Sequence, residues 1–129
     1  MPLNITVEMR KVGVYIAKLQ GRLDSGTYMF LEERLAPFLD PSTKGIILDM
    51  GELEYISSAG VRVVFKTRKF LESQNGSFIM THLKPQIEKV FEIINALPSM
   101  NIFRSVEEAD QYLDLMQKKE IRRQKEQRP

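Results

Sequence analysis

The stretch of residues 46–70 constrains the fold of this chain more than any other part. It opens with the apolar run Ile46, Ile47 and Leu48, which is typical of a strand buried on both faces in the middle of a sheet. We expect this strand to end at residues 49–51 and to be followed by a short acidic loop. The pair Ser57 and Ser58 then precedes apolar residues at helical spacing, so one of the two serines should cap a helix.

The same spacing predicts an exposed serine hydroxyl close to the positive end of a helix dipole. Such a position suits a phosphate group, and Ser58 is the residue of interest.

The N-terminal segment has the pattern of a β-hairpin. Residues 3–9 alternate apolar and polar side chains, a turn is expected at Arg10 and Lys11, and a second strand is expected over residues 12–19. In that strand we expect Val14, Ile16 and Leu19 to point inward. The short connection favours antiparallel pairing.

The rest of the chain alternates helices and strands. A helix should begin near Asp24 and end at Pro37, and the helix that follows Ser58 should end at residues 75–76. We then expect a strand over residues 78–83, a helix over residues 85–97, a short edge strand over residues 101–104 and a last helix from a capping box at residues 105–108. The fold class is therefore α/β, with a mixed sheet of four to five strands and helices packed on it.

Length and composition bound the class of protein. A chain of 129 residues with 43% apolar residues is sized for one domain. It contains no cysteine and one histidine, which leaves out disulfides, thiol catalysis and the usual zinc sites. No apolar run approaches the roughly 18 residues of a membrane span, so we expect a cytoplasmic protein.

The charge is uneven along the chain. Residues 118–129 carry a net charge of +4, and the preceding 117 residues carry −2. A mildly acidic body argues against nucleic-acid binding by the folded part. We therefore divide the chain into a domain at 1–117 and a basic helical extension or disordered tail at 118–129.

A catalytic interpretation of Ser58 finds little support. A hydrolase could use Ser58 with His82 and Asp49, but the nucleophile elbow requires glycine two residues before and two after the serine. Ile56 and Gly60 occupy those places, so half of the pattern is present. We expect no catalytic residues.

Phosphate-binding loops and metal sites are also not expected. Neither a Walker sequence nor G-x-G-x-x-G occurs. Asp49, Glu52 and Glu54 could in principle bind Mg²⁺, but we interpret them as a polar loop and predict neither metal nor cofactor.

The helix after Ser58 has two different faces. Arg62, Lys66 and Lys69 fall together on the side opposite the apolar residues, with Ser58 at the edge of this basic face. Taken alone, three basic residues on a surface helix are ordinary solvent contacts. Together with the serine, they could form one docking surface for an acidic partner.

Three motifs resemble a known family. Residues 21–24 (GRLD), 46–49 (IILD) and above all 55–63 (YISSAGVRV) resemble the STAS domain of bacterial anti-sigma factor antagonists, and the likeness extends to about Met116. The resemblance implies a single STAS domain that is not an enzyme. It also implies two partners: an anti-sigma factor serine kinase with a histidine-kinase-like ATPase fold, and a PP2C-type phosphatase.

The family pattern places the phosphorylated serine at Ser58, with Ser57 as second choice because it offers another hydroxyl. This chain has Ser57 where many members have aspartate and Ala59 where many have a second hydroxyl. We expect phosphorylation to add a charge of about −1.5 to −2 and to release the kinase. The expected partner-binding residues are Asp24, Asp49, Ser57, Ser58, Arg62, Lys66 and Lys69.

Other functions stay open at this point. The domain could be a scaffold subunit of a larger signalling assembly that is never phosphorylated, or a small hydrolase that uses Ser58. The basic tail could bind nucleic acid or an acidic membrane surface. The oligomeric state does not follow from the sequence.

Overall fold

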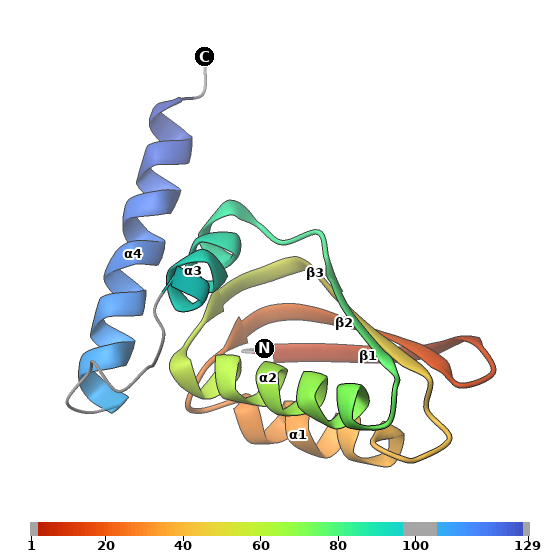
Figure 1. The fold of residues 1–129 in the computed structure, drawn as a ribbon. Helices are drawn as coiled ribbons and strands as arrows, with labels where there is room; N and C mark the ends of the chain where they lie inside the picture. Colours follow the sequence, from red (N-terminus) through yellow and green to blue (C-terminus); the bar gives the residue numbers. More distant parts are fainter. Residues whose placement is uncertain (1–2, 97–105, 128–129) are drawn as a thin grey trace.

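The structure is a computed structural model that describes residues 3–96 and 106–127. Figure 1 shows one sheet with helices α1 and α2 along one side of it, and with α3 and α4 near the end of β3. In chain order the elements are β1 (Leu3–Lys11), β2 (Val14–Leu23), α1 (Tyr28–Leu35), the 3-10 helix η1 (Ala36–Phe38), β3 (Gly45–Ile56), α2 (Ser58–Ser73), β4 (Ser77–Thr81), α3 (Pro85–Ala96) and α4 (Val106–Glu126).

The sheet is mixed and has the strand order β1-β2-β3-β4. Strands β1 and β2 pair antiparallel, whereas β2 with β3 and β3 with β4 pair parallel. The helices α1 and α2 make the two crossover connections that parallel neighbours require. The predicted α/β class and mixed sheet are therefore confirmed.

The hairpin turn lies slightly later than predicted. Arg10 and Lys11 belong to β1, and the loop consists of Val12 and Gly13, whose φ of 83° favours glycine. The prediction of a turn at Arg10 and Lys11 was therefore wrong, although the antiparallel pairing is confirmed.

The second strand also faces differently from the prediction. Ala17 and Leu19 are buried, whereas Val14 and Ile16 lie on the opposite face and are half-buried. Leu19 was predicted correctly, but Val14 and Ile16 were not. The strand starts with four consecutive apolar residues, so alternation alone did not identify its inner face.

Strand β3 is longer than predicted, because the expected acidic loop after Leu48 is the second half of the strand. Two register shifts against β2 explain the error. Between Lys18 and Gln20, and again between Gly21 and Arg22, β3 contains one more residue than its partner. Each extra residue is a bulge that shifts the inward-facing position by one. The buried side chains therefore follow an irregular series: Ile46, Leu48, Met50, Leu53 and Ile56.

The helices pack on the sheet mainly through apolar side chains. The predicted inner face of α2 is confirmed, because its buried residues include Val61, Val63, Val64, Thr67 and Leu71. Helices α2 and α3 contact each other through Phe65 and Phe91, whose rings meet edge to face at 6.2 Å between centroids. Both helices therefore share one core with the sheet.

Strand β4 is shorter than the predicted 78–83, and its last residue, Thr81, pairs with Asp49. The second half of β3 therefore has no strand neighbour on its β4 side within the described residues. The ends of two helices agree with prediction: Asn75 has a φ of 61° just after α2, and Pro85 opens α3. The predicted strand at 101–104 and Ser105 of the capping box lie outside the described residues.

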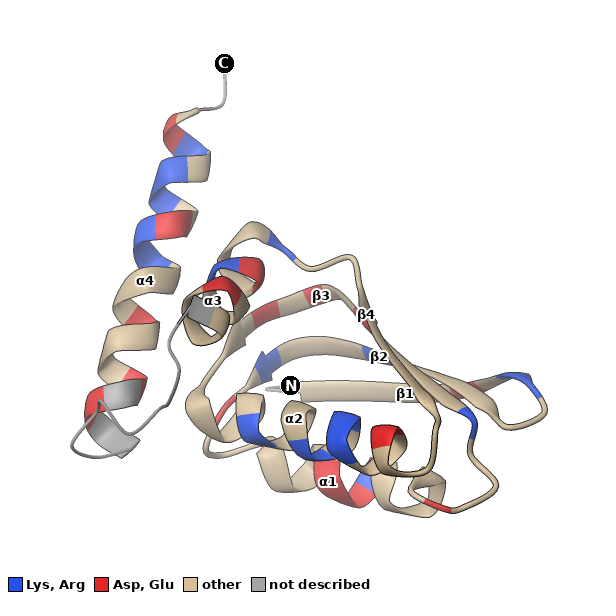
Figure 2. Ribbon diagram, viewed as in Figure 1, with Lys and Arg blue, Asp and Glu red and all other residues tan. Residues whose placement is uncertain are grey.

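The last helix packs along α3 and also contacts α2. Its C-terminal half extends away from the sheet (Figure 1), and residues 118–126 of the basic segment are part of it. Figure 2 shows Lys and Arg concentrated there. No helix in residues 3–96 and 106–127 has an apolar span of the length that a bilayer requires.

Candidate functional site

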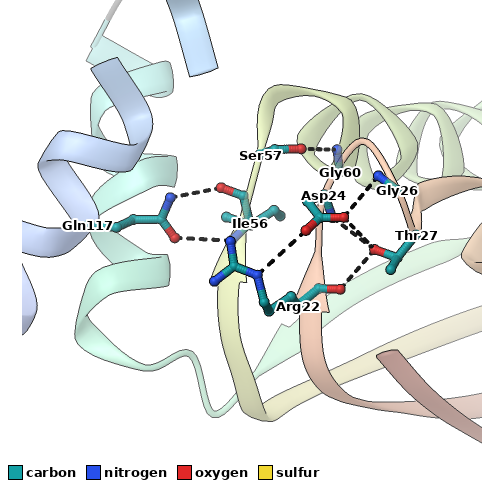
Figure 3. A network of polar contacts seen from close by, with 8 residues as sticks. All are labelled: Arg22, Asp24, Gly26, Thr27, Ile56, Ser57, Gly60 and Gln117. Atoms are coloured by element: carbon teal, nitrogen blue, oxygen red, sulfur yellow. Dashed lines mark hydrogen bonds and ion pairs between the residues drawn. The ribbon is translucent and has the colours of Figure 1, made fainter. Parts of the chain in front are cut away.

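The site is centred on the junction between β3 and α2. Ser57 is the N-cap of α2, with extended backbone (φ −100°, ψ 177°) and a side-chain oxygen that accepts a hydrogen bond from the Gly60 N–H at 3.4 Å (Figure 3). Its own N–H donates to the Leu23 carbonyl at 2.9 Å, which ties the junction to the end of β2. The prediction that one serine caps the helix is confirmed, and that serine is Ser57.

Gly60 allows the first turn of α2 to press against the sheet. A Cβ atom at this position would lie 2.7 Å from Leu23 Cγ and 2.9 Å from Ile56 Cγ1. Neither atom is at the free end of its side chain, so any larger residue would move the helix or the strand ends. The glycine of the Ser-Ser-Ala-Gly motif therefore sets the position of both serines.

Ser58 is the first residue of α2 and is only 8% exposed. Its hydroxyl donates to Asp110 Oδ1 at 2.6 Å, and its backbone N–H donates to the same oxygen at 3.0 Å. Asp110 belongs to α4, so the last helix covers the serine. The prediction of an exposed hydroxyl was wrong, because the covering carboxylate is 52 positions away in the sequence.

Side-chain amides occupy the open edge of β3. Ser57 bonds to β2, so the alternation of the strand turns the N–H and C=O of Ile56 the other way. The side chain of Gln117 in α4, 1% exposed, meets both groups: Oε1 accepts from the Ile56 N–H at 3.0 Å, and Nε2 donates to the Ile56 carbonyl at 2.8 Å (Figure 3). Nearby, Gln86 Nε2 of α3 donates to the Glu54 carbonyl at 3.2 Å. Two glutamines thus satisfy backbone groups that β4 does not reach.

A polar network lies beside the junction, at the end of β2 (Figure 3). Asp24 Oδ1 accepts from the Gly26 N–H at 2.9 Å, and Asp24 Oδ2 lies 3.5 Å from Arg22 Nε. The Thr27 hydroxyl donates to the Arg22 carbonyl at 2.8 Å and accepts from the Asp24 N–H at 2.9 Å. The predicted site residue Asp24 therefore shapes the loop before α1 and is brought close to the serine pair.

Charged side chains surround Tyr55, which precedes Ile56 at this junction. The Arg22 guanidinium lies 4.0 Å from the centre of its ring. Burial is the main cause that raises the pKa of Tyr55, and the negative charge of Asp114 adds to it; the positive charge of Arg22 acts in the opposite direction, and Asp110 and Asp24 make smaller raising contributions. Carboxylates from the β2 end and from α4 therefore lie around this junction, together with the Arg22 cation that pairs with Asp24.

Asp49 is not brought together with the serines. Its Oδ1 accepts from the Gly51 N–H at 3.0 Å and lies 3.4 Å from His82 Nδ1. Ile56 lies seven positions further along the extended strand, which is about 20 Å at the usual rise per residue. The geometry also separates His82 from Ser58, so the three residues of the hydrolase interpretation do not form a triad.

The basic side chains of α2, Arg62, Lys66 and Lys69, are exposed. Figure 2 shows Lys and Arg positions along this helix. Lys66 Nζ lies 3.3 Å from Glu32 Oε2 of α1, whereas Arg62 and Lys69 form no ion pair within the described part of the chain. Among those residues no group of three or more His, Cys, Asp or Glu side chains is arranged to hold a metal ion.

Comparison with known proteins identifies the family. The STAS domain family matches residues 6–109. The protein BtrV of Bordetella bronchiseptica, which carries the name of an anti-sigma factor antagonist, is 40% identical over 97 residues that cover 75% of this chain and 84% of BtrV. This chain belongs to the STAS-domain family of anti-sigma factor antagonists.

More distant relatives agree with this assignment. The anti-sigma-B factor antagonist of Staphylococcus aureus is 27% identical over 93 residues, which cover 72% of this STAS chain and 86% of the relative. The unphosphorylated form of the anti-sigma factor antagonist SpoIIAA superposes with a TM-score of 0.65 at 22% identity, over 71% of this chain and 81% of SpoIIAA. That structural likeness shows the same fold.

Sequence reasoning missed two residues of this STAS domain's site, Asp110 and Gln117. Both lie in α4 beyond the matched residues 6–109. One signal was available in the sequence: Gln117 continues the inner face of the last helix, one turn after Leu113, where an apolar residue would be expected. The contact between Asp110 and Ser58 had no such signal, because it depends on how two distant helices pack.

Proposed function

We propose that this chain is a cytoplasmic anti-sigma factor antagonist that acts by partner switching. Its unphosphorylated form binds an anti-sigma factor serine kinase of the histidine-kinase-like ATPase class and frees the sigma factor. Phosphorylation of Ser58 releases the kinase, and a PP2C-type phosphatase restores the binding form. The observation that carries the proposal is the position of Ser58 at the first turn of α2, within the family's signature motif.

The relatives support this proposal in two ways. They are named as anti-sigma factor antagonists. The structure of SpoIIAA has also been solved in a phosphorylated form, which superposes with a TM-score of 0.62. Ser57 is the second candidate for the phosphosite. Its hydroxyl oxygen caps α2, and the residue is 3% exposed, so its modification would break the helix cap that positions the motif.

The switch follows from local electrostatics. A phosphate on Ser58 would bring about −1.5 to −2 charges to the start of α2, where the helix amides favour negative charge in the free protein. In a close interface the same charge would be desolvated beside the carboxylates of Asp24 and the partner's own groups. An unpaired buried charge costs several kcal/mol, which changes affinity by orders of magnitude.

The proposed partner surface extends from the serine pair over the basic face of α2. Arg62 and Lys69 are exposed and without an ion pair in the described part of the chain, so both are available to acidic groups of a partner. Lys66 would first have to leave Glu32. Asp49 stays a prediction that requires a much larger interface. The domain boundary between residues 117 and 118 is also a proposal, since α4 continues through it.

A second function is favoured by the burial of Ser58. A serine that is 8% exposed and bonded to Asp110 suits a scaffold subunit that is never phosphorylated. Such a domain would assemble with other STAS proteins and incorporate no phosphate.

Binding measurements with the unmodified kinase distinguish the two functions. We expect Ser58→Ala to bind a candidate anti-sigma factor kinase with the affinity of the parent chain, and Ser58→Asp to bind at least about tenfold more weakly, a difference of 1.4 kcal/mol. Lys18→Asp, an exposed substitution on β2, is the control for added negative charge elsewhere. Equal affinities of the alanine and aspartate forms would contradict the switch.

A further inference from the structure

Helix α4 closes over the residue that the proposed function requires to be modified. Asp110 Oδ1 accepts from both the hydroxyl and the backbone N–H of Ser58, at 2.6 and 3.0 Å. We propose that α4 is an internal cover of the Ser58 site, that it must detach before Ser58 can be phosphorylated, and that the phosphate then prevents it from returning. This inference rests on the proposed role of Ser58.

Phosphoryl transfer to Ser58 requires an accessible hydroxyl. Ser58 Oγ must attack the γ-phosphorus of ATP while the bond to the bridging β-phosphate oxygen breaks, ADP leaves with that electron pair, and the hydroxyl proton passes to a base. Here Ser58 as a whole is 8% exposed, and its hydroxyl donates its proton to a hydrogen bond with Asp110. A kinase can neither approach the oxygen in line nor place its own base there while α4 is docked.

The second step concerns what holds α4 in place. Among the α4 side chains that the structure describes, the buried ones are Leu113, Gln117 and Glu120. Two of the three are polar, and the bidentate contact of Gln117 with Ile56 is the main tie to the sheet. The remaining packing of α4 is mainly against α3, and a helix with one buried apolar side chain among those described can open locally at a lower free energy than the core unfolds. The cover can therefore detach while α2 and the sheet stay folded.

The third step is the effect of the phosphate. Asp110 already occupies the position in front of the Ser58 N–H that a phosphate oxygen would take at this helix start. Asp114 lies one turn further along α4 and adds negative charge near Tyr55. A dianionic group on Ser58 would meet the Asp110 carboxylate at close range, and Asp110 has no ion-pair partner among the described residues, whereas Asp114 is paired with Lys118. Repulsion between like charges would keep α4 away.

The match to the family ends at residue 109, so Asp110 and Gln117 lie beyond it. The two side chains that tie the cover to the Ser58 site thus follow the matched residues, although α4 itself begins at Val106, within them. Helix α4 would also regulate the site, because a ligand bound to its exposed basic half could change the rate at which Ser58 is phosphorylated.

The absence of cysteine gives a direct test that needs no kinase. A Ser58→Cys chain carries a single thiol, and its rate of reaction with a small disulfide reagent, 5,5′-dithiobis(2-nitrobenzoic acid), reports how often α4 leaves. Adding Gln117→Ala should raise that rate about tenfold or more, because two buried backbone groups of Ile56 lose their partner in the docked state. Adding Asp114→Ala should leave it within about twofold, since Asp114 pairs with Lys118 and not with residue 58.

The result that overturns the cover is a Ser58→Cys thiol that reacts as fast as a Lys69→Cys thiol on the exposed face and is insensitive to Gln117→Ala. If the double variant does not fold, Asp110→Ala takes the place of Gln117→Ala, because it changes a half-exposed residue. Neither result depends on whether Ser58 is a kinase substrate.

The converse effect is measured in the full chain by hydrogen exchange. Ser58→Asp should speed the exchange of α4 amides between residues 110 and 117 about tenfold relative to Ser58→Asn, which has the same shape without the charge. Equal exchange in the two variants would contradict the repulsion step. If both tests succeed but the chain is never phosphorylated, the proposal that α4 covers Ser58 stands and the proposed partner switch is wrong.

Discussion

Helices α2 and α4 meet at Ser58, but different forces hold them. Eight of the 16 residues of α2 are buried, and most of them are apolar or small. Helix α4 is longer, yet its buried side chains among those described are Leu113, Gln117 and Glu120. Helix α2 therefore holds Ser58 against the core, whereas α4 packs over Ser58 and can detach.

The largest expected effect tests this difference with matched substitutions. Leu71→Ala in α2 should lower the free energy of unfolding by about 2–5 kcal/mol, because Leu71 is fully buried and a cavity remains. Leu113→Ala in α4 should lower the global value by less, since α4 can detach while the rest stays folded. Urea denaturation followed by circular dichroism measures both. Equal losses would show that α4 is part of the same cooperative unit and would break the comparison.

The next effect sharpens the role of the α2 start. Gly60→Ala should cost about 1–3 kcal/mol, because the new Cβ would press on Leu23 and Ile56. Gly26→Ala is the control: its Cβ would meet only Asp24 Oδ1, at 3.4 Å. The same denaturation experiment applies to both. A Gly60→Ala chain as stable as the control would mean that the junction is less tightly packed than the structure shows.

The smallest effect concerns pH and the outer part of α4. A hydrogen bond from Arg123 is the main cause that lowers the pKa of Glu120 below its ordinary value of 4.5, and Gln124 adds another. A lowered pKa in the folded helix means that the stabilisation is present above 4.5 and is lost as the pH falls through the lowered value.

The chemical shifts of residues 120–124 should therefore report less helix in the parent chain as the pH falls below 4.5. In Glu120→Gln this part of the pH dependence should disappear, with less than about a fivefold change in local opening, because the side chain of the partner Arg123 is 57% exposed and solvent screens the pair. Glu126→Gln, at the end of the same helix, is the matched control. Identical pH profiles for the Glu120 and Glu126 variants would remove this contact from the account of α4.

The order of the elements could be predicted from the sequence because local signals determine it. The apolar run at 46–48, the serine pair before α2, the positive φ at Asn75 and Pro85 at the start of α3 all act within a few residues. The register of β3 could not, because two bulges move its buried positions from even to odd numbers and back. The acidic residues in that half of the strand therefore gave it the sequence pattern of a loop.

The residues of the candidate site could be predicted from the sequence, but the side chains that cover them could not. The motif located Ser57 and Ser58 and predicted that one of them caps the helix, and the structure identifies Ser57 as that cap. The exposure of Ser58 depends instead on Asp110, and the open edge of β3 depends on Gln117. Both contacts join segments more than 50 residues apart, and no periodicity in either segment encodes the other.

The central claim, that Ser58 is the residue modified in a partner switch, is tested most directly by mass spectrometry. The purified full chain is incubated with candidate anti-sigma factor kinases and ATP, its intact mass is measured, and the phosphosite is located by fragmentation. The account predicts a single added phosphate on Ser58 and none in Ser58→Ala. A phosphate on Ser57 or elsewhere, or no phosphate with a kinase that binds the chain, would contradict it.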